Sequence, residues 1–139
     1  MDEYKRTGKR DCLILSVGSF VNGRNRDNCQ EKVHKLKKIP RIFVPYEIYH
    51  NFLKTDAKRL EKTFQKLDFD CHTFYGDIPL WQAEREIKEL SKCQTGKDMF
   101  CLCLLTHGDW TERGQIMLFS DGNFTTLERL TEVFIFFSD

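Results

Sequence analysis

The pair His107-Gly108, which follows the apolar run at residues 99–105, has the residue types that acid–base chemistry needs. Imidazole titrates near neutral pH and is a common general base, and a neighbouring glycine lets a backbone N–H approach a developing oxyanion. The run carries no charge on either face, which predicts a strand covered on both sides. Because ligands of open α/β sheets bind at the carboxyl ends of strands, His107 and Gly108 are candidate catalytic residues. A plain turn after a buried strand is the alternative.

A histidine base needs a nucleophile, and Cys101 and Cys103 are the nearest thiols in the sequence. A strand rises ~3.3 Å per residue, so Cys103 lies ~13 Å before His107, whereas a Cys–His pair needs ~3–4 Å. We therefore predict that both are core cysteines and that all six cysteines of the chain are free thiols. The sequence has no CxxC pair at zinc-site spacing, so no metal site and no cofactor are predicted.

Strands and helices alternate before this corner, as judged by the spacing of apolar residues. Ala57, Leu60 and Phe64 form one helical stripe, and Pro79 opens a second helix. The predicted order is strand 12–17, helix 55–67, strand 68–74, helix 79–90 and strand 99–105. That order predicts right-handed crossovers and a doubly wound α/β fold, with a mainly parallel sheet and helices on both faces.

The remaining segments have less regular patterns. They are an irregular edge segment at 42–52, a polar turn at 109–115, a strand or hairpin arm at 115–119 and a last helix bearing Leu127, Leu130 and Phe134. Pro45 argues against a central strand in the first of these segments. Thr125 and Glu128 form a capping box, which predicts the start of the last helix.

The composition describes one soluble globular domain, with 139 residues of which 40% are hydrophobic and 31% charged. No apolar run approaches the ~20 residues of a membrane span, and the charged start lacks the apolar centre of a signal peptide. A cytoplasmic protein without a membrane partner is therefore expected. Basic residues gather in a short helix predicted at 29–39, but stacking aromatics are not interleaved there, so we predict a solvated surface and no nucleic-acid partner.

Four stretches resemble, in order, the large subunit of the caspases, the Asp-directed cysteine proteases of apoptosis and inflammation. They are RDCLILSVGSF, TDAKRLEKTFQKLDFDCHTF, EREIKELSK, and MFCLCLLTHGD with GQIMLFSDG. The resemblance covers roughly residues 9–20 and 52–134. It implies an N-terminal extension at 1–8 and a partial large-subunit domain at 9–139 with a divergent insertion at about 21–51. The implied fold is the three-layer caspase fold with an incomplete sheet.

The resemblance also implies roles for individual residues. His107 corresponds to the catalytic histidine of the family, and Gly108 to the glycine whose N–H helps to form the oxyanion hole. Thr106 stands where serine is common. His50 falls where the family has an arginine that helps to bind the substrate aspartate, and a neutral imidazole is a poor substitute for a bidentate guanidinium.

The nucleophile of the caspases belongs to a Q-A-C-x-G motif ~50 residues after the histidine, which predicts a position near ~157, whereas the sequence ends at Asp139. We therefore expect the isolated chain to be inactive, and the strand at 99–105 to lie at an open sheet edge that pairs readily with another chain. The expected role is that of a decoy or modulator that associates with a complete caspase or a caspase regulator. The alternative is the large-subunit portion of an active Asp-directed cysteine endopeptidase, whose nucleophile and small subunit lie outside this sequence.

Overall fold

The computed structural model of the chain describes residues 8–21, 46–112 and 114–137, and their side chains except for those of 46–54 and 136–137. Its elements are β1 Lys9–Val17, α2 Tyr46–Lys66, β2 Phe69–Gly76, α3 Leu80–Ser91, β3 Lys97–Leu105, β4 Gly108–Thr111, β5 Gly114–Leu118, β6 Phe124–Thr125 and α4 Leu127–Phe137. The alternation of strands and helices predicted up to β3 is confirmed in these ranges. The basic helix predicted at 29–39 lies outside the described residues.

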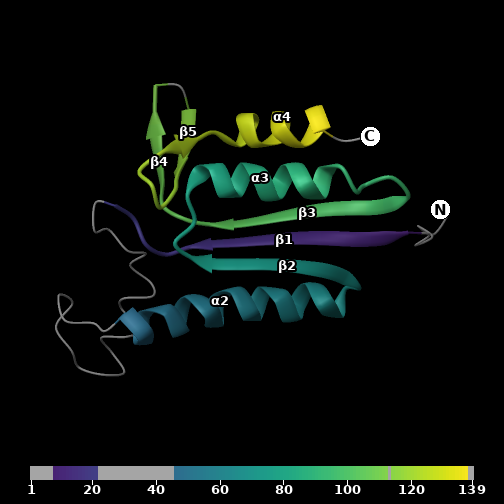
Figure 1. The fold of residues 1–139 in the computed structure, drawn as a ribbon, viewed down its shortest axis with the longest axis horizontal. Coiled ribbons are helices and arrows are strands. Elements are labelled where there is room, and N and C mark those ends of the chain that lie inside the picture. Colours follow the sequence, from purple (N-terminus) through teal and green to yellow (C-terminus); the bar gives the residue numbers. More distant parts are fainter. Residues whose placement is uncertain (1–7, 22–45, 113, 138–139) are drawn as a thin grey trace.

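A three-stranded parallel sheet in the order β2-β1-β3 lies at the centre of the molecule (Figure 1). Leu13 of β1 pairs in register with His72 of β2 and with Leu102 of β3. Helix α2 covers one face of the sheet, and α3 and α4 cover the other. The predicted α/β fold, with helices on both faces of a parallel sheet, is confirmed.

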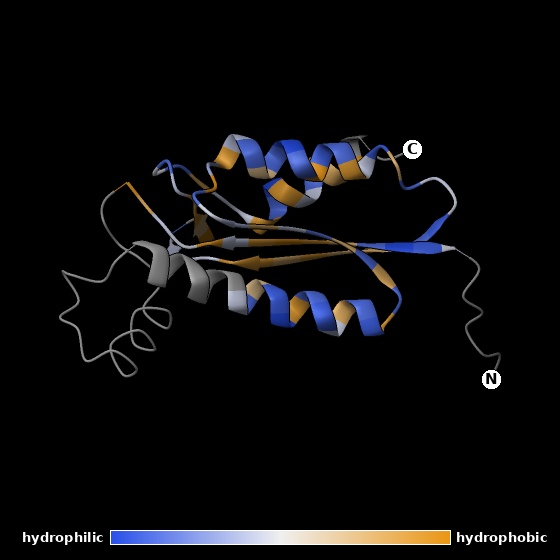
Figure 2. Ribbon diagram, turned by 60° about the horizontal axis from the view of Figure 1, so that its bottom comes forward, coloured by the Kyte–Doolittle hydropathy of each residue, from blue (hydrophilic) through white to orange (hydrophobic). Residues whose placement is uncertain are grey.

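The side chains of β1 divide the core into two clusters, one on each face of the sheet. Leu13, Leu15 and Val17 pack with side chains of α3 and α4, whereas Cys12 and Ile14 pack with side chains of α2. All five are at most 1% exposed. Figure 2 shows the hydrophobic stretches of the strands lying between helices whose outward surfaces are largely hydrophilic. The alternating side chains of β1 therefore pack against apolar stripes of the helices on both faces of the sheet.

Helix α2 is longer than the sequence predicts, since it begins at Tyr46. The prediction of an irregular edge segment at 42–52 is therefore wrong from residue 46 onward. Pro45 directly precedes the helix, and proline is common at helix starts because the first turn needs no N–H from it. No helix in the described ranges has the length and apolar character needed to cross a membrane.

Helix α4 forms as predicted, but its cap is one residue later than the predicted capping box. The N–H of Arg129 donates a hydrogen bond to the Thr126 hydroxyl oxygen at 3.1 Å. Thr125 instead belongs to β6 and is buried. Two adjacent threonines give the same local signal, and the pairing of β6 with β5 decides which of them is free to cap.

A second sheet follows the parallel one in the chain, with the antiparallel strand order β4-β5-β6. The strand or hairpin arm predicted at 115–119 is confirmed as β5. The polar turn predicted at 109–115 is wrong at both ends, because residues 109–111 belong to β4 and residues 114–115 belong to β5. All four residues of β4 are exposed, so the strand carries no apolar alternation by which the sequence could reveal it.

Candidate functional site

The Thr-His-Gly corner lies at the carboxyl end of β3, where the hairpin β4-β5 begins (Figure 1). The Thr106 hydroxyl donates a hydrogen bond to the carbonyl oxygen of Leu118. The N–H of Leu118 donates to the carbonyl oxygen of His107 at 2.9 Å. These two bonds hold the backbone of the corner against β5, so the position of the imidazole depends on the hairpin as well as on β3.

Phe20 packs beside the candidate base His107. Its ring centroid lies 4.8 Å from that of His107, with an interplanar angle of 39°. Phe20 follows the end of β1, and the N–H of Gly18 donates to the carbonyl oxygen of Gly76 at the end of β2 at 3.0 Å. Sequence reasoning missed Phe20, although the carboxyl ends of parallel strands meet at one edge of the sheet. The half-buried imidazole of His107 therefore has an apolar wall on one side.

Gly108 packs closely against the paired strand of the hairpin. It pairs with Met117, and a Cβ atom at this position would lie 3.3 Å from the carbonyl oxygen of Ile116. This contact is tighter than most Cβ contacts, so Ile116 would have to shift by a few tenths of an ångström to admit a side chain here. The glycine thus has a structural reason beside the oxyanion role that the resemblance implies.

Ser120 connects the end of the β4-β5 hairpin to the segment after β1 and to the loop between β2 and α3. Its buried hydroxyl accepts a hydrogen bond from the N–H of Ile78 at 2.7 Å, and its carbonyl oxygen accepts one from Val21 at 2.9 Å. The adjacent Asp121 accepts a bond from the N–H of Leu80 at 3.4 Å, at the start of α3. Burial raises the pKa of the Asp121 carboxyl, but hydrogen bonds from Asn123 and backbone N–H groups outweigh it and leave the pKa below its usual value. The sequence suggests only a turn at Asp121.

The thiols of the described residues lie away from this corner. Cys101 and Cys103 belong to the cluster under α2 together with Cys12, and Cys93 lies in the loop before β3. Burial, with neighbouring thiols, raises the pKa of Cys103 to about 11 and raises that of Cys12 further. Protonated thiols are poor nucleophiles. The arrangement therefore offers a histidine base, and Cys12, Cys101 and Cys103 behave as core residues, whereas Cys93 is exposed.

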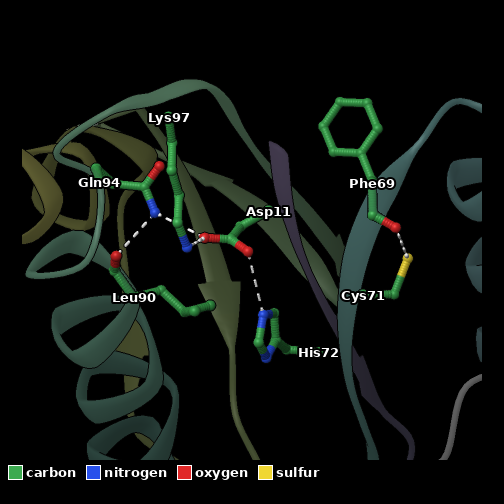
Figure 3. A network of polar contacts seen from close by, with 7 residues as sticks. All are labelled: Asp11, Phe69, Cys71, His72, Leu90, Gln94 and Lys97. Atoms are coloured by element: carbon green, nitrogen blue, oxygen red, sulfur yellow. Dashed lines mark hydrogen bonds and ion pairs between the residues drawn. The ribbon is translucent and has the colours of Figure 1, made fainter. Parts of the chain in front are cut away.

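The amino end of the sheet has a polar network of its own, shown in Figure 3. Asp11 is 1% exposed and forms an ion pair with Lys97 of β3. Its carboxylate also accepts a hydrogen bond from Gln94 at 3.0 Å and lies 3.4 Å from Nε2 of His72. Burial raises the pKa of Asp11, but the bonds from Lys97, Gln94 and His72 outweigh it and lower the pKa. This network ties β1 to both of its neighbours, which suits a structural role.

A family model described as the caspase domain matches residues 51–136, which is more than half of the chain. The chain belongs to the caspase family. The matched range runs from α2 to α4 and includes the His107-Gly108 corner. The resemblance that the sequence motifs suggest is confirmed. A search of curated protein sequences finds no match.

The fold is that of a solved caspase. The crystal structure of the Drosophila initiator caspase Dronc matches with a TM-score of 0.64 over 93% of this chain, at 16% sequence identity. This chain spans 43% of the length of that chain. At this identity the likeness concerns the fold alone, and it confirms the expected caspase architecture.

The roles that the caspase resemblance assigns to His107, Gly108 and His50 stay predictions. His107 and Gly108 lie together at the carboxyl end of β3, a suitable place for a base and an oxyanion donor. His50 belongs to α2, but its side chain is outside the described residues, so its predicted relation to the corner is not tested. The domain bounds predicted at 1–8 and 9–139 also stay predictions.

Proposed function

We propose that this caspase-family chain has no peptidase activity by itself and acts as a decoy or modulator that binds a complete caspase. The observation that carries the proposal is the incomplete cover of β3. Its residues are apolar on both faces, yet the side chains from 100 to 105 are only half-buried. Among the described strands β3 pairs with β1 alone, so one edge lies open.

An open edge of a parallel sheet suits pairing with an extended segment of another protein. Its backbone N–H and C=O groups form a template for one more strand, and side chains on the two faces give specificity. Phe100 and Leu102 face α3 and α4, whereas Cys101 and Cys103 face α2. A bound strand would therefore extend both halves of the core at once. A caspase partner fits because its own sheet has the same layered construction.

An apolar groove of about 260 Å³ lies beside this edge, between β3, α3 and α4. Its walls include Ile87, Phe100, Leu102, Leu127, Thr131 and Phe134. Phe100 and Phe134 stack with ring centroids 4.6 Å apart and an interplanar angle of 22°. Burial of apolar surface contributes ~25 cal/mol per Å², so a side chain that follows the bound strand into this groove would strengthen the association.

The proposed lack of activity follows from the chemistry of the corner. The 139-residue sequence contains no Q-A-C-x-G motif. Four of the described thiols belong to the core cluster under α2 and not to the corner that carries His107. Without a nucleophile a general base cannot run acyl transfer. The purified chain is therefore expected to leave an Asp-containing reporter peptide intact. Hydrolysis that His107→Ala abolishes would contradict the proposal.

Association is tested by mixing the chain with an active, complete caspase and measuring the dissociation constant and the caspase's rate. Thr131→Lys places a charge in the apolar groove and is expected to weaken binding about tenfold, which is ~1.4 kcal/mol. Glu128→Gln changes the net charge by the same amount on the exposed side of α4 and should leave binding unchanged. No association with any complete caspase of the source cells would overturn the proposal.

The alternative, a large-subunit portion of an active Asp-directed cysteine endopeptidase, is favoured by the position of His107-Gly108 at the strand end. It predicts an in-frame Q-A-C-x-G motif in the transcript downstream of the codon for Asp139. The corresponding longer protein should then cleave after aspartate, and His107→Ala should abolish that cleavage. Such a result would replace the decoy with a working protease.

A further inference from the structure

The face of the sheet under α2 carries a row of thiols that the sequence places far apart. Cys12 of β1 pairs in register with Cys71 of β2 and with Cys101 of β3. Strand partners in register share a face, and Cys103 shares the face of Cys101 because it follows two residues later. Four of the six cysteines of the chain therefore point toward one helix.

Three of these thiols are close enough to share one ion. The Sγ atoms of Cys12, Cys101 and Cys103 all lie within 4.8 Å of one another. Three sulfur ligands around one ion with ~2.3 Å bonds lie ~3.8–4 Å apart, so small rotations of the side chains would complete the coordination. Cys71 lies outside this group, and its thiol lies 3.6 Å from the carbonyl oxygen of Glu61.

We propose that Cys12, Cys101 and Cys103 bind one soft monovalent cation, Cu⁺, in a three-coordinate site that bridges β1 and β3. The sequence predicts no metal site because it lacks CxxC spacing, and this proposal revises that prediction. The signal lies in the strand register, which brings Cys12 to Cys101 and Cys103, about ninety residues later in the sequence. The site does not depend on the proposed association with a caspase.

The number and kind of ligands select the ion. Thiolates favour Cu⁺ and Zn²⁺ over harder cations, but structural Zn²⁺ is almost always bound by four ligands. The described group offers three sulfur atoms, which suits Cu⁺. Each thiol that binds as thiolate forms its Cu–S bond as its proton leaves to solvent, and neither the metal nor the sulfur changes oxidation state.

Access and charge also fit the site. Cys101 and Cys103 are half-buried on the open-edge strand, so an ion has a path that does not require α2 to leave. Cys12 is 0% exposed and forms the floor of the site. The partial exposure of Cys101 and Cys103 lets solvent screen the net negative charge that arises when more than one thiol binds Cu⁺ as thiolate.

The test is an anaerobic Cu⁺ titration of the full-length, reduced chain in competition with a chromophoric Cu⁺ chelator. Cys29→Ser and Cys93→Ser are introduced first, because Cys93 is exposed and Cys29 is outside the described residues. One Cu⁺ per chain, a near-ultraviolet thiolate-to-copper band and a higher urea midpoint are expected. Binding of no Cu⁺ in competition with the chelator would overturn the proposal.

Matched serine variants assign the ligands. Cys101→Ser and Cys103→Ser should each lower Cu⁺ affinity at least about tenfold and weaken the band, whereas Cys71→Ser should leave both unchanged. Circular dichroism identifies any variant that fails to fold, and the other ligand variant then decides. Equal affinity in the Cys71 and ligand variants would contradict the assignment. Displacement of Cu⁺ by an equal concentration of Zn²⁺ would contradict the three-ligand site.

Discussion

The strands β1 and β3 have similar apolar sequences and different surroundings. They pair in register, and Leu13 in β1 lies beside Leu102 in β3. Yet Leu13 is 0% exposed, whereas Leu102 is only half-buried. Both strands are covered on two faces, but β1 has a neighbour on each edge and β3 has one among the described strands. An apolar run in the sequence thus indicates that both faces of a strand are covered. Whether both edges are paired depends on the strand order of the sheet.

The largest expected effect comes from comparing Leu13→Ala with Leu102→Ala. The two leucines belong to the same core cluster, so the change in chemistry is identical. Leu13→Ala should lower the free energy of unfolding by ~4 kcal/mol, and Leu102→Ala by about half of that, because a half-exposed side chain leaves a smaller cavity. Urea unfolding measures both. Equal losses would show that the edge of β3 is covered in solution.

The amino ends of the same strands offer a second test, since Asp11 of β1 and Lys97 of β3 form an ion pair. Asp11→Ala leaves the ammonium group without its partner and should cost ~3 kcal/mol. Combining it with Lys97→Met should cost less than the sum of the single variants, as a double-mutant cycle in urea would measure. Additive losses would mean that the pair contributes little to joining the two strands.

Acid should weaken the molecule through the same carboxylate. The pKa values of Asp11 and Asp121 lie below the ordinary value of 3.8 in the folded chain. The contribution of these two carboxylates to the free energy of unfolding is therefore complete above pH ~4. It is lost as the pH falls below that value toward the lower folded pKa. As the pH falls below ~4, the urea midpoint of the unchanged chain should fall, but by less than the drop that Asp11→Ala causes at neutral pH. Asp11→Asn should flatten this dependence, and an unchanged slope would assign it to other groups.

The smallest predicted effect concerns the carboxyl end of β3. Thr106→Val removes the hydroxyl that bonds to the Leu118 carbonyl and should cost ~1 kcal/mol, whereas Thr106→Ser keeps the bond and should cost little. Amide hydrogen exchange in β5 should rise in the valine variant alone. A rise in both variants would mean that the methyl group, not the hydroxyl, positions the hairpin.

The sequence predicts elements whose apolar spacing is local and regular. The helix stripe through Ala57 and the uninterrupted run of β3 are of this kind, and both are confirmed. It fails at β4, where every residue is exposed, and at the cap of α4, where two threonines compete. The pairing of β4 and β6 with β5 decides both cases, and no local sequence pattern predicts that pairing.

The candidate site divides in the same way. His107 and Gly108 are recognisable because they interrupt an apolar run and match a caspase motif. Phe20 is missed because it meets His107 only in the folded chain, and Ser120 because its bond with Ile78 joins segments that are distant in the sequence. The thiol row is missed for a similar reason, since Cys12 meets Cys101 through the register of two distant strands.

The register of β1 also has a consequence for synthesis on the ribosome. The first partner of Arg10 is Phe69, so about sixty residues must be made before β1 can pair with any described strand. At ~5–20 residues per second this takes on the order of seconds, during which the apolar segment of β1 has no described strand to pair with. Chaperones that bind extended hydrophobic segments should therefore engage β1 before the parallel sheet forms.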